Sequence, residues 1–477
     1  MKAINKDILK LAIPSILANI TVPIVGMVDI AVAGHLDTQA AVMIGGIAIG
    51  TMLFDLLYWN FGFLRVGTGG LTAQAFGKGD RKECATIFAR AIGISLACAL
   101  ALIAIQWIFV KAAFLVVDCT PEVRALASQY FFIRIWAAPA TLSLMAFKGW
   151  FIGMQDSVSP MLTDLTVNGM NVLMSFVLAL GIKAVGYEGM GFPGIAAGTV
   201  AAQYSGLLVA VLLAVFKYRR NTFSTLSLSD LKGVFKGSET RRFFVMNTDL
   251  FVRSLCFIAI YIGFTVISAR YGDLLLAVSS IMMKLLMIFS YFTDGFAYAG
   301  EAMTGKYIGA KDAVMLRQTV KWTFVWSMGI ALIFIGIYHF AGVPLLRMMT
   351  SDVTVVEASR EYLPWLLLMP VIGCAAFTWD GIYIGATASK AIRNSMLWAV
   401  VGFTAVWFIG IACLNWLSSG IGLDSAAAGS LPASGSDVSG ATDYGRIAMH
   451  ILMAAYFAHL LARTIYLSAK YRKVVHI

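Results

Sequence analysis

The sequence predicts an all-α integral membrane protein with twelve transmembrane helices in two pseudo-symmetric six-helix lobes. Three observations predict this fold class: the apolar composition, the alternation of basic loops and an internal repeat. Of the 477 residues, 60% are hydrophobic and 13% are charged, and the mean hydropathy is +0.82. Such a chain is too apolar for a soluble domain. At roughly 20 residues per crossing, it has room for about twelve helices joined by short loops.

Apolar segments place the helices in order along the chain. Their approximate ranges are 8–34, 41–66, 85–110, 123–152, 158–182, 190–216, 242–269, 275–305, 318–341, 355–386, 395–417 and 445–469. We expect an amino-terminal lobe over 1–216, a cytoplasmic linker over 217–241 and a carboxyl-terminal lobe over 242–477. The stretch 418–443 is rich in Ser, Ala and Gly, which predicts a disordered external loop.

Basic residues cluster in alternate loops. Representative members are Lys6, Arg81, Arg220, Lys311 and Lys470. Lys and Arg are retained on the cytoplasmic side during insertion, so we expect both termini to be cytoplasmic in a multi-pass protein of the inner membrane. This distribution accounts for the net charge of +11 without a nucleic-acid partner.

An internal repeat has an offset of 232 residues. The residues matched after the second and eighth helices are Thr72 with Thr304, Gly77 with Gly309 and Asp80 with Asp312. At the same offset, 149–153 matches 381–385. Each half therefore holds an even number of helices, and both halves have the same orientation. In transporters built from such parallel repeats, the solute binds between two halves that rock against each other.

Several classes of site have no sequence signal. The six cysteines occur singly, so we expect neither a disulfide nor a metal site. The motifs of zinc proteases, serine hydrolases and P-loop nucleotide binding are absent, so transport would use an ion gradient or run downhill. We expect no cofactor and a monomer surrounded by membrane lipid.

Asp29 is the first candidate site residue, because a charged group at the centre of a membrane helix costs roughly 2.5–3.5 kcal/mol. It follows Pro23, whose missing N–H would bend the first helix. Burial disfavours the charged form of a carboxylate, so Asp29 could take up a proton and exchange it for a cationic solute. Alternatively, Asp29 lies about two turns from the external end and is simply hydrated there.

A second group of ionisable residues lies in the carboxyl-terminal half. Its members are Arg253, Asp294, Glu301 and Asp380. Asp294 and Glu301 are seven residues apart and share a helix face. The four could form a functional network, or an ion-pair network that only holds helices together. Two further intramembrane candidates, Asp55 and Lys284, have no predicted partner.

The stretches 19–37, 71–77, 294–299 and 380–396 resemble the DinF-type branch of the MATE (multidrug and toxic compound extrusion) family. The resemblance spans nearly the whole chain and implies twelve helices in two six-helix lobes. It also implies cation-coupled export of amphipathic, often cationic, organic compounds. The family's acidic residue in the first helix falls on Asp29.

The sequence departs from this family in the fifth helix. The family pattern Asn-x-x-x-Asp reads here Asn171 to Ser175, so the second carboxylate is a serine. Asn171 and Thr199 match the family's amide and hydroxyl ligands. Sodium gains most from anionic oxygens, so we expect proton coupling through Asp29, or partly through the carboxyl-terminal acids, with sodium as the alternative ion.

Two other functions remain open from the sequence. A lipid-linked precursor flippase of the same superfamily would share the two-lobe plan and line its cavity with cations. We expect more acids than bases in the central cavity, with Arg253 as the main exception, which favours the exporter. A membrane-embedded enzyme or receptor is the alternative from a different class.

Overall fold

The computed structural model describes residues 2–21, 28–29, 32–33, 40–115, 117, 119–182, 186–227, 233, 235, 238–350, 352–420 and 438–475. Long helices dominate this part of the chain, and its one β-type pairing is a bridge between Ile182 and Tyr187. The predicted kink at Pro23 and the residues 421–437 lie outside the described residues.

The helices of the first half are α1 (Lys2–Ile20), α3 (Ala40–Trp59), α4 (Phe63–Gly77), α5 (Arg81–Ala113), α6 (Pro121–Arg134), α7 (Ala138–Gly153), α8 (Val158–Leu180) and α9 (Phe192–Tyr218). Short 3₁₀ turns continue α3 into α4 and α6 into α7 (Asn60–Gly62 and Ile135–Ala137), so each pair makes one crossing. The helices of the second half are α11 (Ser238–Ala269), α12 (Asp273–Gly309), α13 (Ala313–Met349), α14 (Val353–Arg360), α15 (Leu363–Gly385), α16 (Ser389–Gly420) and α17 (Val438–Val474).

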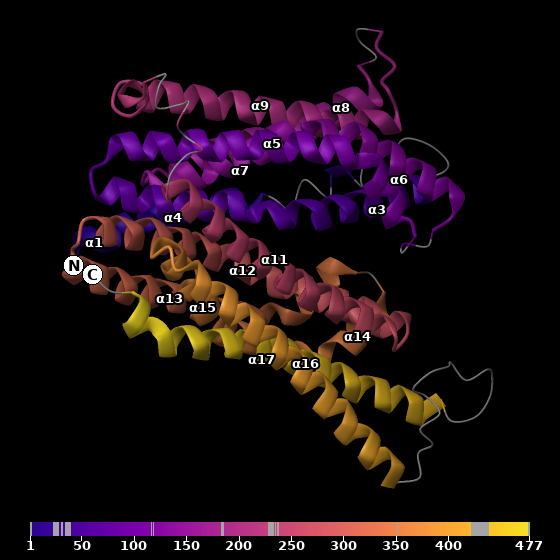
Figure 1. The fold of residues 1–477 in the computed structure, drawn as a ribbon. Coiled ribbons are helices and arrows are strands. Elements are labelled where there is room, and N and C mark those ends of the chain that lie inside the picture. Colours follow the sequence, from indigo (N-terminus) through magenta and orange to yellow (C-terminus); the bar gives the residue numbers. More distant parts are fainter. Residues whose placement is uncertain are drawn as a thin grey trace.

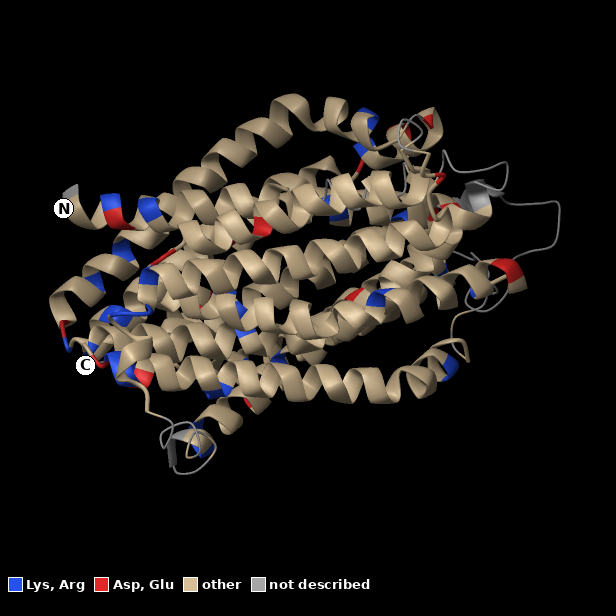
Figure 2. Cartoon of the chain, turned by 90° about the horizontal axis from the view of Figure 1, so that it is seen from above, with Lys and Arg blue, Asp and Glu red and all other residues tan. Residues whose placement is uncertain are grey.

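Eleven helical segments in the described residues are long and apolar enough to cross a membrane. With the first helix, which starts with α1, they make the predicted twelve-helix membrane fold. Figure 2 shows that charged residues gather toward the helix ends, many of the Lys and Arg residues at the end that holds both termini. Because α16 extends to Gly420 and α17 starts at Val438, the predicted loop 418–443 is too long at both ends. Each helix continues past its apolar span, since adding a residue to an existing helix is easier than starting one.

The chain forms two helical layers, α3–α9 in one and α11–α17 in the other (Figure 1). Within the first, α8 packs on α9 and α4 on α7; within the second, α16 packs on α17 and α12 on α15. Helix α1 packs on α12 as well as on α8, and α4 also packs on α12. The helices α1, α4 and α12 therefore join the two halves.

The turns after α4 and α12 share one geometry, which confirms the internal repeat. Gly79 and its equivalent Lys311 both have positive φ, 76° and 56°. The next residue in each turn, Asp80 or Asp312, caps the following helix by accepting a hydrogen bond from the N–H three residues on. Both turns therefore start a new helix in the same way.

The two halves are in close contact at the end where both termini lie (Figure 1). A Cβ at Gly77 would lie 1.9 Å from the Lys306 carbonyl oxygen, and a Cβ at Gly309 would lie 2.1 Å from the Gln74 carbonyl oxygen. These two contacts are related by the 232-residue offset, so a pseudo-twofold axis passes between α4 and α12. Only glycine allows backbones to approach this closely.

Candidate functional site in the two halves

The first site in the amino-terminal half is built around Asp29. Its side chain is buried, with 6% of its surface exposed, and its Oδ1 accepts a hydrogen bond of 3.2 Å from the Ser175 hydroxyl on α8. Asp29 therefore faces neighbouring helices rather than bulk water, which removes the hydrated-interface alternative. Ser175 occupies the position of the expected second carboxylate and contacts Asp29 directly.

Asn171 and Thr199 form the next part of this site. Asn171 lies one turn before Ser175 on α8, and its Nδ2 donates to Thr199 Oγ1 on α9 at 2.9 Å. The helices approach closely because Gly198 has no side chain: a Cβ there would lie 2.7 Å from the Ser175 nitrogen. The amide oxygen of Asn171 is buried without a partner in the described part of the chain. It is thus available to a bound cation, a proton donor or water.

Arg134 is the functional candidate that the sequence analysis missed in this half. Its guanidinium lies within electrostatic range of Asp29 and Asp55, and it donates to the Tyr130 hydroxyl at 3.0 Å. It also stacks over the Phe54 ring at 4.8 Å. Asp29 is consequently not an isolated charge. The sequence signal was available, since Arg134 interrupts an apolar run from Phe131 to Trp136.

The second site lies in the carboxyl-terminal half around Asp380. Arg253 on α11 donates to Asp380 Oδ2 at 2.8 Å, and Arg463 on α17 bonds to the same oxygen. Arg463 is 2% exposed, so this is a buried arrangement of one carboxylate and two guanidiniums. The sequence analysis did not identify Arg463, because nothing in the sequence shows which face of α17 packs on α15.

Glu301 has its direct partner in the other half. The Arg65 Nη1 atom on α4 lies 3.1 Å from Glu301 Oε2 on α12, and Glu301 is fully buried. The four predicted residues therefore do not form one bonded network within their half. Asp294 lies within electrostatic range of Arg65, Arg253 and Asp380.

The acids of this region have more cations beside them than Arg253 alone, which corrects the expectation that Arg253 is the main exception. Lys148 on α7 binds Asp164 on α8 at 2.7 Å and lies within electrostatic range of Asp294. By the 232-residue offset, Lys148 is the counterpart of Asp380. Besides Arg253, the cations among these acids are Arg65, Arg134, Lys148 and Arg463. The sequence did not reveal these further cations, because it does not show which residues on distant helices face the acids.

The two remaining intramembrane candidates differ in their surroundings. Asp55 on α3 lies within electrostatic range of Arg134 and of Tyr261 on α11, so it faces the other half. Lys284 on α12 is exposed, and no partner of it is found among the described residues. Within the described residues, no group of three or more His, Cys, Asp or Glu side chains could hold a metal ion.

Comparison with known proteins identifies the family. The MatE family model matches residues 14–177 and, a second time, residues 250–411, one match in each half. The DNA damage-inducible protein F of Escherichia coli is 32% identical over 417 residues, covering 87% of each chain. A protein of Photorhabdus laumondii named "Probable multidrug resistance protein NorM" is 23% identical over 436 residues, covering 88% of this chain and 90% of the relative.

Solved structures show the same fold at low sequence identity. A MOP superfamily transporter from Pyrococcus furiosus has a TM-score of 0.76 at 16% identity, covering 99% of this chain and 96% of that chain. A MATE structure in a bent conformation has a TM-score of 0.75 at 14% identity, covering 99% and 95%. The match of the family model to both halves and the identity with the Escherichia coli protein show that this chain is a transporter, not an enzyme, and belongs to the MatE family.

Proposed function

We propose that this chain is a proton-coupled antiporter that exports amphipathic, often cationic, organic compounds by alternating access of its two lobes. The single observation that carries the proposal is the buried contact between Asp29 and the Ser175 hydroxyl. One buried carboxylate beside neutral hydrogen-bonding groups can hold a proton in one state and a cationic solute in another.

Two features favour a proton over sodium as the coupling ion. Hard cations bind best to several anionic oxygens, and Asp29 supplies the only carboxylate among the described residues of this site. Ser175 offers a neutral hydroxyl where the family pattern has an acid.

Two further features belong to the proposal. The basic residues at the end that holds both termini support a cytoplasmic location for these termini in the inner membrane. The chain acts as a monomer, because each half already packs on the other through α1, α4 and α12.

The alternative of a flippase is not favoured by the charged residues inside the helices. The embedded cations each bind a carboxylate, so they do not form the phosphate-binding surface of a flippase; they are Arg65, Lys148, Arg253 and Arg463.

The test uses purified protein in proteoliposomes loaded with a fluorescent organic cation. We expect an imposed pH gradient to drive transport with or without sodium, and Asp29→Asn to lose at least about tenfold of this gradient-dependent flux, because a single buried carboxylate carries the proton. Asp273→Asn is the matched control, since it removes an exposed acid at the start of α12. Strict dependence on sodium, or full activity of Asp29→Asn, would refute the proposal.

Ser175→Asp tests the choice of ion from the opposite direction. It places a second carboxylate about 3 Å from Asp29, where two like charges cannot both be ionised without a cation between them. We expect this variant to gain sodium-stimulated transport, while Ser175→Ala remains proton-driven. If sodium affects neither variant, the site is not the ion-coupling site.

A further inference from the structure

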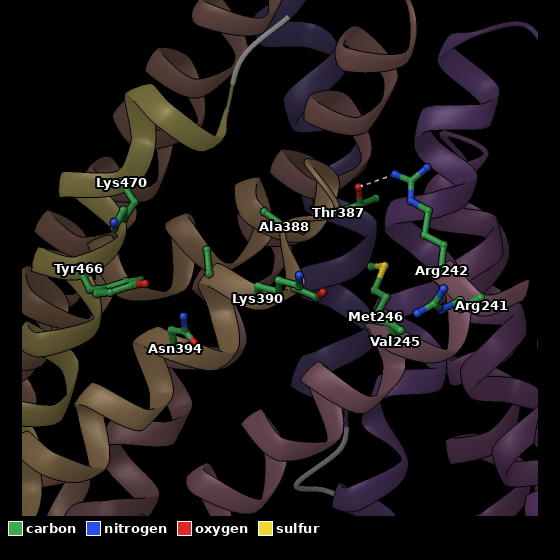
Figure 3. Close-up of a pocket in the computed structure, with 12 residues that line it drawn as sticks. Arg241, Arg242, Val245, Met246, Thr387, Ala388, Lys390, Asn394, Tyr466 and Lys470 are labelled. Carbon is green, nitrogen blue, oxygen red and sulfur yellow. Dashed lines mark hydrogen bonds between the residues drawn. The ribbon is translucent and has the colours of Figure 1, made fainter. Parts of the chain in front are cut away.

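A pocket lies where the first turns of α11, the start of α16 and the last turns of α17 meet (Figure 3). Neither Asp29 nor Asp380 lines it. Its volume is about 600 Å³. Four cations from the three helices line it: Arg241, Arg242, Lys390 and Lys470. Figure 3 shows the two arginines on one side, Lys470 on the opposite side and Lys390 between them. None of the lining residues that the structure describes is acidic.

Backbone and neutral groups add to the positive potential of the pocket. Helix α16 starts at Ser389, so its first N–H groups and the positive end of its dipole lie at the pocket wall. Asn394 and Tyr466 contribute polar side chains. The nearby Asp249 does not cancel this potential, since the Arg393 Nη1 atom lies 2.6 Å from its Oδ1 and the Ser389 hydroxyl donates to its Oδ2 at 2.7 Å.

One of the cations is held in place before any ligand binds. Arg242 Nη2 donates to the Thr387 hydroxyl at 3.1 Å, as the dashed line in Figure 3 shows. Thr387 lies in the turn between α15 and α16 and also accepts a hydrogen bond from Gln74 of the other half. A side chain fixed in this way loses less conformational freedom when it binds an anion.

Part of the pocket wall is apolar. Val245, Met246, Ala388 and Ala391 line it. Beyond the pocket, the exposed side chains of α11 and α16 are large and apolar, among them Trp398, 58% exposed. The cations thus lie at the helix ends, and exposed apolar side chains follow along the membrane-spanning parts of α11 and α16. This arrangement matches an amphipathic anion, with its charge at the membrane surface and its chains in the bilayer.

We propose that this pocket binds the phosphate-bearing headgroup of an anionic membrane lipid. The four cations and the α16 amino terminus hold the phosphate, and the apolar wall holds the start of the acyl chains. Free phosphate has the same charge chemistry but makes no use of the apolar wall. The lipid would come from the leaflet on the side of the two termini. This assignment rests on the orientation given in the proposed function, whereas the binding itself does not depend on that orientation.

The test measures lipid binding to the full-length protein in detergent by native mass spectrometry. The probes are phosphatidylglycerol, phosphatidylcholine at the same ratio, and inorganic phosphate as a competitor. Arg241→Gln with Arg242→Gln removes two pocket cations. The matched control is Arg219→Gln with Arg220→Gln, an exposed arginine pair just after α9 that does not line the pocket. Both variants lose the same charge.

We expect the wild type to prefer phosphatidylglycerol over phosphatidylcholine. The pocket variant should bind phosphatidylglycerol about 25-fold more weakly, at about fivefold per cation beside an anionic lipid, and the control should stay near wild type. Equal weakening in both variants would overturn the proposal in favour of diffuse attraction. Competition by millimolar inorganic phosphate would overturn the lipid as the ligand. No transport step enters this assay. A negative lipid-binding result therefore does not affect the proposal of proton coupling, and a negative transport result does not affect the proposal of lipid binding.

Discussion

Replacing Gly77 with alanine should disrupt the contact between the two halves. The added Cβ would lie 1.9 Å from the Lys306 carbonyl oxygen, whereas ordinary contact begins at 3.4 Å, so the helices must separate by about 1.5 Å. The obstacle is a backbone atom, which cannot rotate away. Overpacking of this kind costs about 1–3 kcal/mol. The conformation in which these ends meet should therefore lose about 5-fold to about 150-fold in population relative to one in which they separate.

The assay is the distance between spin labels at two exposed turn positions, Lys78 after α4 and Lys311 after α12, together with the melting temperature in detergent. Gly336→Ala in α13 is the matched control, because a Cβ there meets nothing within 4 Å. We expect it to keep the wild-type distance and melt no earlier, since alanine favours a helix over glycine by up to about 1 kcal/mol. Gly309→Ala should behave as Gly77→Ala does, because its contact is the symmetric one.

The reasoning would be refuted by a Gly77→Ala protein with the wild-type label distance and the melting temperature of Gly336→Ala. That result would mean that α4 and α12 already have room at their crossing. A lower melting temperature with an unchanged distance would mean that the substitution strains both conformations equally.

Two other predictions concern stability, measured as the melting temperature. Glu301→Gln removes the fully buried carboxylate that pairs with the partly buried Arg65, and it should cost about 3–5 kcal/mol. A loss no larger than that of Glu357→Gln, which breaks an exposed ion pair worth at most about 1 kcal/mol, would contradict this. Burial alone would raise the pKa of Asp156 in the loop between α7 and α8, but hydrogen bonds from Ser159 and Lys217 hold this pKa below its ordinary value of 3.8. The stabilising effect of the Asp156 carboxylate is therefore complete above pH 3.8 and is lost as the pH falls through the lowered pKa. Asp156→Asn should melt earlier than wild type at pH 7, and this difference in melting temperature should shrink below pH 3.8.

The fold could be predicted from the sequence because its causes are distributed along the chain. The apolar composition requires membrane helices, and the repeat fixes their grouping into two lobes. The contacts of Asn171 with Thr199 and of Ser175 with Asp29 followed from the resemblance to a family, and the structure brings both pairs together.

Arg253 and Asp380, which the sequence placed in one candidate network, do form an ion pair. The other ion-pair partners could not be predicted, because they depend on how helices distant in sequence face one another. Arg463 approaches Asp380 across 83 positions, and Arg65 approaches Glu301 across 236. No spacing rule connects such residues. Lys148 is different: it directly precedes a repeated motif, so the same offset could have matched it to Asp380.

The opposite charges of Lys148 and Asp380 mean that the halves are no longer interchangeable. A chain assembled from two copies of the first half would place a lysine where Asp380 now receives two arginines. A chain assembled from two copies of the second half would place an aspartate at the position of Lys148 and would lack its partner Asp164, whose position matches Met396 at the 232-residue offset. The two halves of the repeat thus carry different charged pairs, and one pair, Arg65 with Glu301, joins them.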